Sequence, residues 1–223
     1  MIYLIEENAG QTQLTLKGET YKYLVKVLRH SLGDKLKLRN KECIQELHTY
    51  EIASIDGRSL DLKLLSTAID EVNPPKELHI AWCVIDIKSI EKVLPSLNEI
   101  GVSKISFIYC DRSQKNFKLD FKRFERILET SMQQSGRTHI MEFEVYKNIS
   151  VLIEEFPDTK VFDFSDNILK GDSNFKRVLI GCEGGFSKAE KELLRTQEVF
   201  RLDTPMILRS ESAAVAVASK ILL

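Results

Sequence analysis

Cysteine is scarce in this sequence, and no two cysteines have the spacing of a structural metal site. The four thiols, at positions 43, 83, 110 and 182, lie far apart, and no Cys-x-x-Cys pair is present. The four histidines add no spacing typical of metal ligands. We therefore expect a reduced, cytoplasmic protein without a bound metal ion.

Long apolar runs and a strong net charge are also missing. No run approaches the roughly 18 apolar residues that a membrane span needs. The first ten residues, MIYLIEENAG, lack the basic segment of a secretory signal. The formal net charge of the 223 residues is −1, so overall charge does not indicate a nucleic-acid binder. We expect no membrane partner.

The common phosphate-binding signatures are absent as well. Gly181 is followed by Cys182 and Glu183, so GxGxxG fails, and GxxxxGK[ST] is not found. A nicotinamide cofactor or a nucleoside triphosphate is therefore disfavoured. No Ser-His-Asp or Cys-His arrangement indicates nucleophilic catalysis, and we interpret Cys182 as a packing residue.

The most informative segment that is present covers residues 177–192, RVLIGCEGGFSKAEKE. Its first four residues predict a short strand, and the three glycines that follow leave the next turn free of side chains. Ser187 and Glu190 then fit a capping box that begins a helix. Ligands bind at the carboxyl ends of strands in open α/β sheets, so this turn is a candidate binding loop. A purely structural tight turn is the alternative.

A second segment, residues 207–213 (ILRSESA), lies near the C-terminus and suggests the other half of a split cofactor site. Glu183 in the first segment could accept hydrogen bonds from a ligand, or simply face solvent. Arg209 could be a fixed cation for a phosphate or a developing anion. An ion pair between Arg209 and Glu211 is the alternative.

The chain divides at a polar stretch, residues 68–75, which contains Pro74-Pro75. Residues 1–67 predict a small, mostly β domain with one amphipathic helix. Residues 76–223 alternate strands and helices, which predicts an α/β domain with a largely parallel sheet. The expected strands are 14–16, 35–39, 60–64, 78–85, 104–109, 161–164, 177–180 and 199–202; the expected helices are 21–28, 90–100 and one from 121 that ends at Gly136.

Two details of the helix at 90–100 are specific. Gly101 is placed to stop it, because glycine accepts the left-handed conformation at a helix C-terminus. Pro95 lies inside it, so we expect a kink or a later start.

Two basic stretches could meet phosphate. Residues 17–41 contain 8 Lys or Arg against 2 acids, and residues 111–137 contain 7 against 4. In the second stretch Arg112, Lys115 and Arg137 could line a wall for RNA phosphates. The alternative is an ordinary solvated surface whose charges are balanced by nearby acids.

Six segments, in order along the chain, resemble motifs of the RsmE family of ribosomal RNA methyltransferases, which belongs to the SPOUT superfamily. They are YLVKVLR with Gly33-Asp34 (HHLxxVLRxxxGD in the family), EIGV at 99–102 (ELGV), Asp111-Arg112-Ser113 (xERS), QSGR at 134–137 (QSGR), IGCEGGFSKAE at 180–190 (IGPEGGFS-x-x-E) and ILRSESA at 207–213 (ILRTETA). Their order and spacing agree over nearly the whole chain.

The resemblance implies a SPOUT α/β domain with a trefoil knot, preceded by a PUA-like β-barrel that binds RNA. It implies a homodimer that binds S-adenosylmethionine in the knot. The implied reaction is methylation of N3 of a uridine in 16S rRNA, near the decoding centre and within the 30S subunit. The alternatives are the same fold acting on another RNA, an RNA-binding protein with lost catalysis, or an unrelated nucleotide-dependent α/β enzyme.

The resemblance also assigns residues. Arg209 would stabilise charge on the uridine, and Glu211 would orient Arg209. The cofactor would contact Gly181, Glu183, Gly184, Gly185, Leu202, Ile207, Leu208 and Arg209. The RNA contacts are expected from the two basic stretches instead, at Lys22, Lys26, Arg29, Lys35, Lys37, Arg112, Lys115 and Arg137.

This sequence departs from the family pattern at three places. The proline of the glycine loop is Cys182, the family's LGPR is Asp203-Thr204-Pro205-Met206, and the N-terminus lacks the usual arginines. We expect these changes to affect RNA contact or the cofactor pocket.

Overall fold

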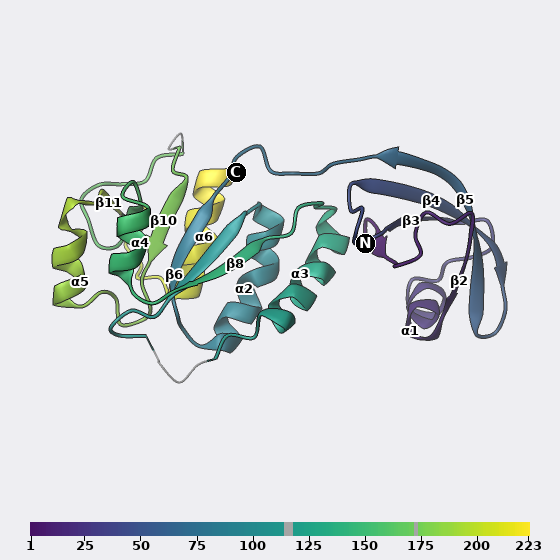
Figure 1. Cartoon of the computed structure of the whole chain (residues 1–223), viewed down its shortest axis with the longest axis horizontal. Helices are drawn as coiled ribbons and strands as arrows, with labels where there is room; N and C mark the ends of the chain where they lie inside the picture. Colours follow the sequence, from purple (N-terminus) through teal and green to yellow (C-terminus); the bar gives the residue numbers. More distant parts are fainter. Residues whose placement is uncertain (114–117, 172–173) are drawn as a thin grey trace. The chain divides into compact units, whose positions relative to one another are not determined.

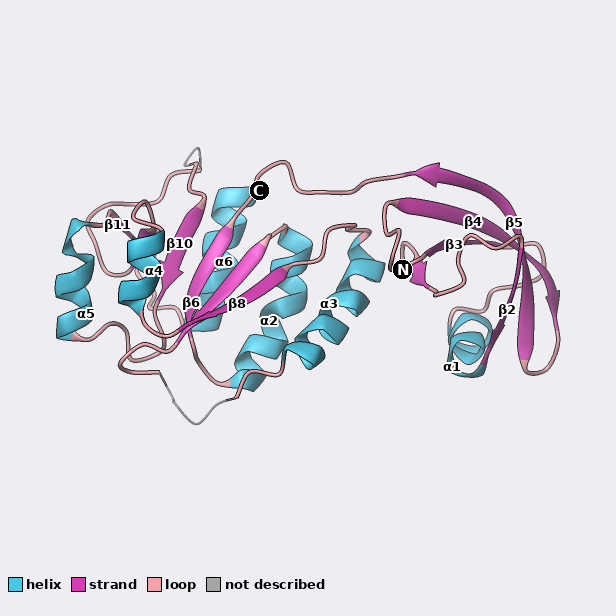
Figure 2. Ribbon diagram, viewed as in Figure 1, coloured by secondary structure: helices cyan, strands magenta, loops and turns pink. Residues whose placement is uncertain are grey.

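The computed structural model describes residues 1–113, 118–171 and 174–223, and its contacts divide them into two compact units. The first unit contains Met1–Asn73 and Met132–His139, and the second contains Pro74–Ser131 and Ile140–Leu223. Figures 1 and 2 show the elements of each unit. No described helix has the length and apolar character that crossing a membrane requires.

The first unit is a five-stranded sheet with one helical segment. In sheet order the strands are β1 (Leu4–Ile5), β3 (Lys35–Arg39), β4 (Glu46–Ile55), β5 (Ser59–Ile69) and β2 (Gln13–Lys17). Only β1 and β3 pair in parallel. The helical segment is α1 (Gly18–Tyr21) continued by a π-helix, η1 (Lys22–Val27).

Period-two alternation builds this sheet. In β2 and β3 the leucines are buried, and the residues between them, Thr15 and Lys37, are exposed, as expected for a strand with one face on the core. Strands β4 and β5 pair as an antiparallel hairpin whose turn lies at residues 56–58. Strand β5 continues to Ile69, past the expected end of the domain at residue 67, because its last residues pair with the start of β4.

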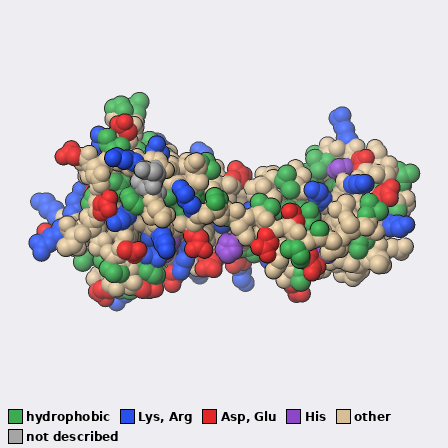
Figure 3. All heavy atoms as spheres, turned by 90° about the horizontal axis from the view of Figure 1, so that it is seen from above, with side chains coloured by type: hydrophobic (Ala, Val, Ile, Leu, Met, Phe, Trp, Pro, Cys, Tyr) green, Lys and Arg blue, Asp and Glu red, His purple; other side chains and the backbone are tan. Residues whose placement is uncertain are grey.

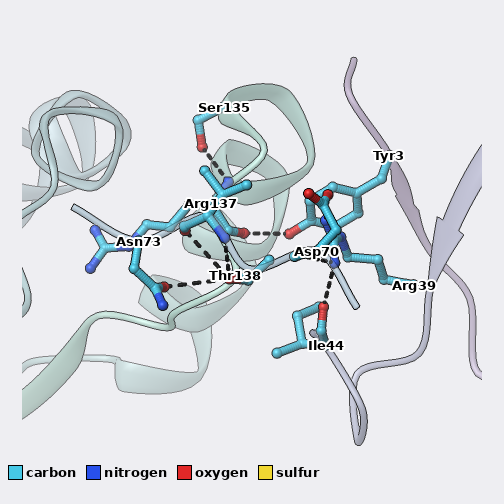
Figure 4. Close-up of polar contacts among 9 residues, drawn as sticks. Tyr3, Arg39, Ile44, Asp70, Asn73, Ser135, Arg137 and Thr138 are labelled. Carbon is cyan, nitrogen blue, oxygen red and sulfur yellow. Dashed lines mark hydrogen bonds and ion pairs between the residues drawn. The ribbon is translucent and has the colours of Figure 1, made fainter. Parts of the chain in front are cut away.

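Residues 132–139 complete the first unit although they lie far from its other residues in the sequence. The Tyr3 hydroxyl donates to the Arg137 carbonyl at 2.7 Å, and Thr138 Oγ1 accepts from Val72 N at 3.0 Å (Figure 4). Arg39 lies over the Tyr3 ring, 4.8 Å from its centroid, and its guanidinium donates to Asp70. The first two bonds connect the end of the QSGR motif to Tyr3, which precedes β1, and the following Thr138 to Val72, which follows β5.

The second unit is a six-stranded, all-parallel sheet flanked by helices (Figure 2). In sheet order the strands are β11 (Val199–Phe200), β9 (Lys160–Phe162), β10 (Arg177–Ile180), β6 (His79–Cys83), β7 (Lys104–Ile108) and β8 (Glu142–Tyr146). The helices are α2 (Ile87–Ile100), α3 (Phe121–Ser135), α4 (Ile149–Glu155), α5 (Lys188–Leu193) with the short η2 (Leu194–Thr196), and α6 (Ser210–Leu222).

The expected elements of this unit are present, with changed ends. Helix α2 begins at Ile87 and runs through Pro95, so a later start was wrong; the Asp86 side chain caps it by accepting from Ser89 N. Gly101 ends α2 with φ 110° and Gly136 ends α3 with φ 88°, as expected. Strand β8 and helix α4 were not anticipated.

Strand β6 is the centre of the core. All five of its residues are buried, and it lies between β10 and β7. A strand covered on both faces is typical of a parallel sheet. Helix α6 packs against α2 and β10 (Figure 1), and its first residue, Ser210, lies beside the glycine loop.

Candidate active site

A pocket of about 640 Å³ opens in the second unit at the carboxyl end of β10. Two chain segments form most of its wall, the glycine loop after β10 and the segment that leads into α6. All eight residues that the sequence assigned to a cofactor line it, namely Gly181, Glu183, Gly184, Gly185, Leu202, Ile207, Leu208 and Arg209. The structure therefore brings together two segments that are separated in sequence.

The backbone of the glycine loop takes a shape that side chains would disturb. Gly185 has φ 65°, in the left-handed region, and its N–H donates to the Cys182 carbonyl at 2.9 Å. A Cβ on Gly184 would lie 3.2 Å from Cδ of Arg112. Arg112 donates to the Gly184 carbonyl, so the arginine lies along the loop and holds it.

The capping box is present and reaches further than the sequence indicated. Ser187 Oγ accepts from Glu190 N, and the Glu190 carboxylate accepts from Ser187 N at 2.8 Å. The same carboxylate accepts from Asp111 N at 2.8 Å. Glu190 is only 8% exposed, so one buried carboxylate joins the loop after β7 to the loop after β10.

Ser210 joins the two halves of the pocket. Its hydroxyl accepts from the buried Trp82 Nε1 at 2.8 Å and donates to the Gly181 carbonyl. Ser210 lines the pocket, and sequence analysis missed it. The signal was available in part, because a buried tryptophan N–H needs an acceptor, but only the fold shows which residue supplies it.

Arg209 is the N-cap residue of α6 and its side chain is exposed at the pocket. Across the described ranges its guanidinium makes no hydrogen bond and no ion pair, so the expected alternative of a pair with Glu211 is not formed. Glu211 lies in the first turn of α6, partly buried, and is outside the pocket wall. Arg209 is thus a cation available to a ligand.

Comparisons with known proteins agree with this geometry. The model of an RNA methyltransferase domain matches residues 72–222, and the model of an RNA methyltransferase PUA domain matches residues 16–65. The chain is 40% identical to Ribosomal RNA small subunit methyltransferase E of Helicobacter pylori strain 26695, over 98% of each protein. This chain belongs to the ribosomal RNA small subunit methyltransferase E family.

More distant members and solved structures extend the likeness. The relative named methyltransferase E in Aquifex aeolicus is 28% identical over 98% of this chain and 97% of its own length. The crystal structure of the Neisseria gonorrhoeae enzyme bound to S-adenosyl methionine covers 98% of this chain and 95% of its own, with a TM-score of 0.74 at 16% identity. At that identity the structural likeness shows the fold alone.

Local contacts accommodate two of the departures from the methyltransferase E pattern. In the segment that replaces LGPR, Thr204 N donates to the Leu202 carbonyl at 2.9 Å, and Thr204 Oγ1 accepts from Met206 N at 3.1 Å. Cys182, in place of the loop proline, is buried with its sulfur 3.7 Å from that of Cys110.

No three histidine, cysteine or acidic side chains of the described ranges form a site for a metal ion.

The residues assigned to RNA are divided between the two units. Lys22, Lys26, Arg29, Lys35 and Lys37 belong to the first unit, where all five are exposed. Arg112 lines the pocket, and Lys115 lies outside the described residues. On the faces visible in Figure 3, positive and negative side chains are interspersed on each unit.

Arg137 is placed differently from the sequence expectation. Its side chain is 4% exposed, and burial lowers its pKa to about 10. Its carbonyl holds the Tyr3 hydroxyl. In this structure Arg137 supports the first unit rather than presenting its charge to RNA phosphates, because its motif turns inward against β1.

Proposed function

We propose that this protein transfers a methyl group from S-adenosylmethionine to N3 of a uridine in 16S rRNA. The observation that carries the proposal is the pocket in which the glycine loop and residues 207–209 meet around the unpaired cation of Arg209. Membership of the methyltransferase E family supports an rRNA substrate. We further propose that the target lies near the decoding centre and is modified within the 30S subunit.

The pocket fits such a cofactor. Its volume lies within the range of about 300–1,000 Å³ that is common for small-molecule sites. Leu202, Ile207 and Leu208 offer apolar contacts to an adenine, and the glycines let the ligand approach the backbone. The exposed Glu183 carboxylate can accept hydrogen bonds from ribose hydroxyls or an amine.

The cofactor, when bound, supplies a methyl group on a positively charged sulfur. The pocket residues would hold the cofactor so that this methyl group could pass to N3, with the bonding electron pair left on sulfur and the N3 proton released. The protein must align the two reactants, since no covalent enzyme intermediate is needed. As N3 loses its proton, negative charge spreads to the carbonyl oxygens of the base, where the Arg209 guanidinium stabilises it.

The remaining groups have supporting roles. Glu211 lies in the first turn of α6, two residues after Arg209, and we infer that it orients this arginine although the two side chains do not pair in this structure. The described pocket wall contains no histidine, so we infer that water or the RNA accepts the proton. The exposed lysines of the first unit, with Arg112, contact RNA phosphates, and the first unit is a PUA-like RNA-binding domain. A cytoplasmic homodimer and a trefoil-knotted second domain complete the proposal.

The test is methyl transfer from labelled S-adenosylmethionine to 30S subunits from a strain that lacks the modification. Nuclease digestion and mass spectrometry would locate the product. Wild type should yield 3-methyluridine in 16S rRNA, and Arg209→Ala should be slower by about 100- to 1,000-fold, the usual effect of removing one charge-stabilising donor. Arg195→Ala is the matched control, because Arg195 lies outside the pocket wall and, among the described residues, forms an exposed ion pair with Glu192.

Each result is informative. Cofactor binding without methylation of 30S subunits would favour another RNA substrate or an RNA-binding protein with lost catalysis. A product at a position other than N3 would refute the assigned chemistry. Equal rates for Arg209→Ala and Arg195→Ala would refute the role of Arg209.

A further inference from the structure

Phe164 is an exposed aromatic side chain in the wall of the pocket. It is 75% exposed, although the other phenylalanines near it, Phe162 and Phe200, pack against each other with ring centroids 5.8 Å apart. Among the described residues Phe164 makes no ring contact. Burying a phenylalanine side chain is worth about 1.5–3 kcal/mol, so this unburied ring in a binding pocket points to a ligand.

The backbone on both sides of Phe164 is held in place. Asp163 N donates to the Phe200 carbonyl at 3.2 Å, and the Asp163 carboxylate pairs with Lys191 at 2.8 Å. Ser165 Oγ donates to the Val199 carbonyl at 3.0 Å. The ring is therefore presented from an anchored segment directly after β9, which lowers the entropy that a ligand must remove on binding.

The charges around the ring favour an RNA base as that ligand. The pocket wall contains the cations Arg112, Lys188, Lys191, Arg201 and Arg209 and the acids Asp163 and Glu183. A mostly cationic wall suits a nucleotide, whose phosphates are negative and whose base stacks on an aromatic ring. An enzyme that modifies a base must take that base out of its stack and hold it by stacking in the site.

We propose that Phe164 is the platform on which the target uracil base stacks, and that it sets the position of N3 for the transfer. This inference rests on the proposed function for the identity of the base. A cofactor adenine or a second copy of the chain could also cover the ring, and both are outcomes of the test below. The buried and half-buried apolar residues Ile180, Leu202 and Leu208 are better suited to enclose an adenine than a ring at the mouth of the pocket.

The experiment compares Phe164→Ala, Phe164→Leu and Phe164→Trp with wild type. Leucine keeps the apolar surface without an aromatic face, and tryptophan keeps the face. Val151→Ala is the control, because Val151 is 41% exposed on α4 and lies outside the pocket wall. The readouts are the Kd for a single-stranded oligouridylate with S-adenosylhomocysteine present, the Kd for S-adenosylhomocysteine alone, kcat/KM on 30S subunits, and mass by sedimentation.

Stacking is worth about 1–3 kcal/mol per base, so the alanine and leucine variants should bind oligouridylate about 5- to 150-fold more weakly. Their kcat/KM on 30S subunits should fall by a similar factor, and tryptophan should restore both values to within a few fold. The Kd for S-adenosylhomocysteine and the mass should not change.

The proposal is overturned if the alanine and leucine variants bind oligouridylate as wild type does. A weaker Kd for S-adenosylhomocysteine would assign the ring to the cofactor, and a halved mass would assign it to a second copy. If wild type does not methylate 30S subunits, the proposed function fails, while the oligouridylate measurement still decides the role of Phe164.

Discussion

At the amino ends of its parallel strands the second unit pairs its charged side chains with one another, whereas at the carboxyl ends it leaves Arg209 and Phe164 open. Arg177 Nε donates to His79 Nδ1 at 2.8 Å, and His79 Nε2 lies 2.7 Å from Ser106 Oγ. The guanidinium of Arg177 also lies over the Phe156 ring, 3.5 Å from its centroid.

The hydrogen-bond network continues beyond Ser106 to two charged side chains. Ser106 Oγ donates to Glu144, whose carboxylate pairs with Lys104 at 2.7 Å. Nothing comparable holds Arg209 among the described residues. The difference teaches that the same unit pairs one arginine within the fold and leaves another unpaired at the pocket. Substitutions at the two ends should therefore separate stability from activity.

The largest expected effect on stability comes from Arg177→Ala. This change removes the donor to His79 and the cation over Phe156, and we expect it to lower the free energy of unfolding by about 2–3 kcal/mol. The Asp158 partner is exposed and contributes little. Urea unfolding measures the loss. Methyl transfer per folded molecule should stay within twofold of wild type. A large loss of activity at unchanged stability would contradict the division between a stabilising end and a functional end of the strands.

An intermediate effect is expected for Ser210→Ala, which should change both stability and binding at the pocket. The Trp82 N–H and the Gly181 carbonyl lose their partner, and a buried polar group left without one costs about 1–3 kcal/mol. We also expect weaker binding of S-adenosylhomocysteine, because Ser210 holds the glycine loop. Ser210→Thr retains the hydroxyl and serves as control. If alanine and threonine behave alike by urea unfolding and calorimetry, the hydroxyl does not join the two segments.

The smallest expected effect is the pH dependence of stability that His79 contributes at the amino ends of the strands. Burial, with the nearby Arg177 charge, lowers the pKa of His79 from 6.5 to about 3. The native state therefore binds fewer protons than the unfolded chain. This contribution to stability is fully present above pH 6.5 and is lost as pH falls toward 3.

Between pH 6 and 5 the loss should be about 1 kcal/mol, before most carboxylates titrate. Urea unfolding at both pH values measures it, with His79→Gln as the variant in which the slope should flatten. An unchanged slope in His79→Gln would show that another group carries the pH dependence. The Kd for S-adenosylhomocysteine should not depend on the protonation of His79, because the histidine lies at the opposite end of the strands from the pocket.

Local patterns predicted the second unit well. The capping box of Ser187 and Glu190 and the stop at Gly101 depend on neighbours within a few residues, and both are confirmed. Pro95 shows the limit, because packing of the apolar face of α2 keeps the helix continuous where local propensity favours a break. The short alternation in β8 was overlooked.

Contacts between distant residues could not be derived from local patterns. Nothing near Arg137 in sequence indicates that its segment closes against β1, so its burial was unexpected. The bond from Trp82 to Ser210 spans 128 positions. Such pairs depend on how strands and helices are arranged in space.

The sequence by itself determined the strand and helix periods, the glycine loop, the segment at 207–213 and the family, because these are properties of short stretches and their order. The tertiary structure decided that the two segments share one pocket, that Arg209 stays unpaired within the described chain and that Phe164 stays exposed. It also decided that Arg137 is buried. The physical reason is that burial and partnership depend on packing between distant segments, whereas helix caps and strand alternation depend on near neighbours.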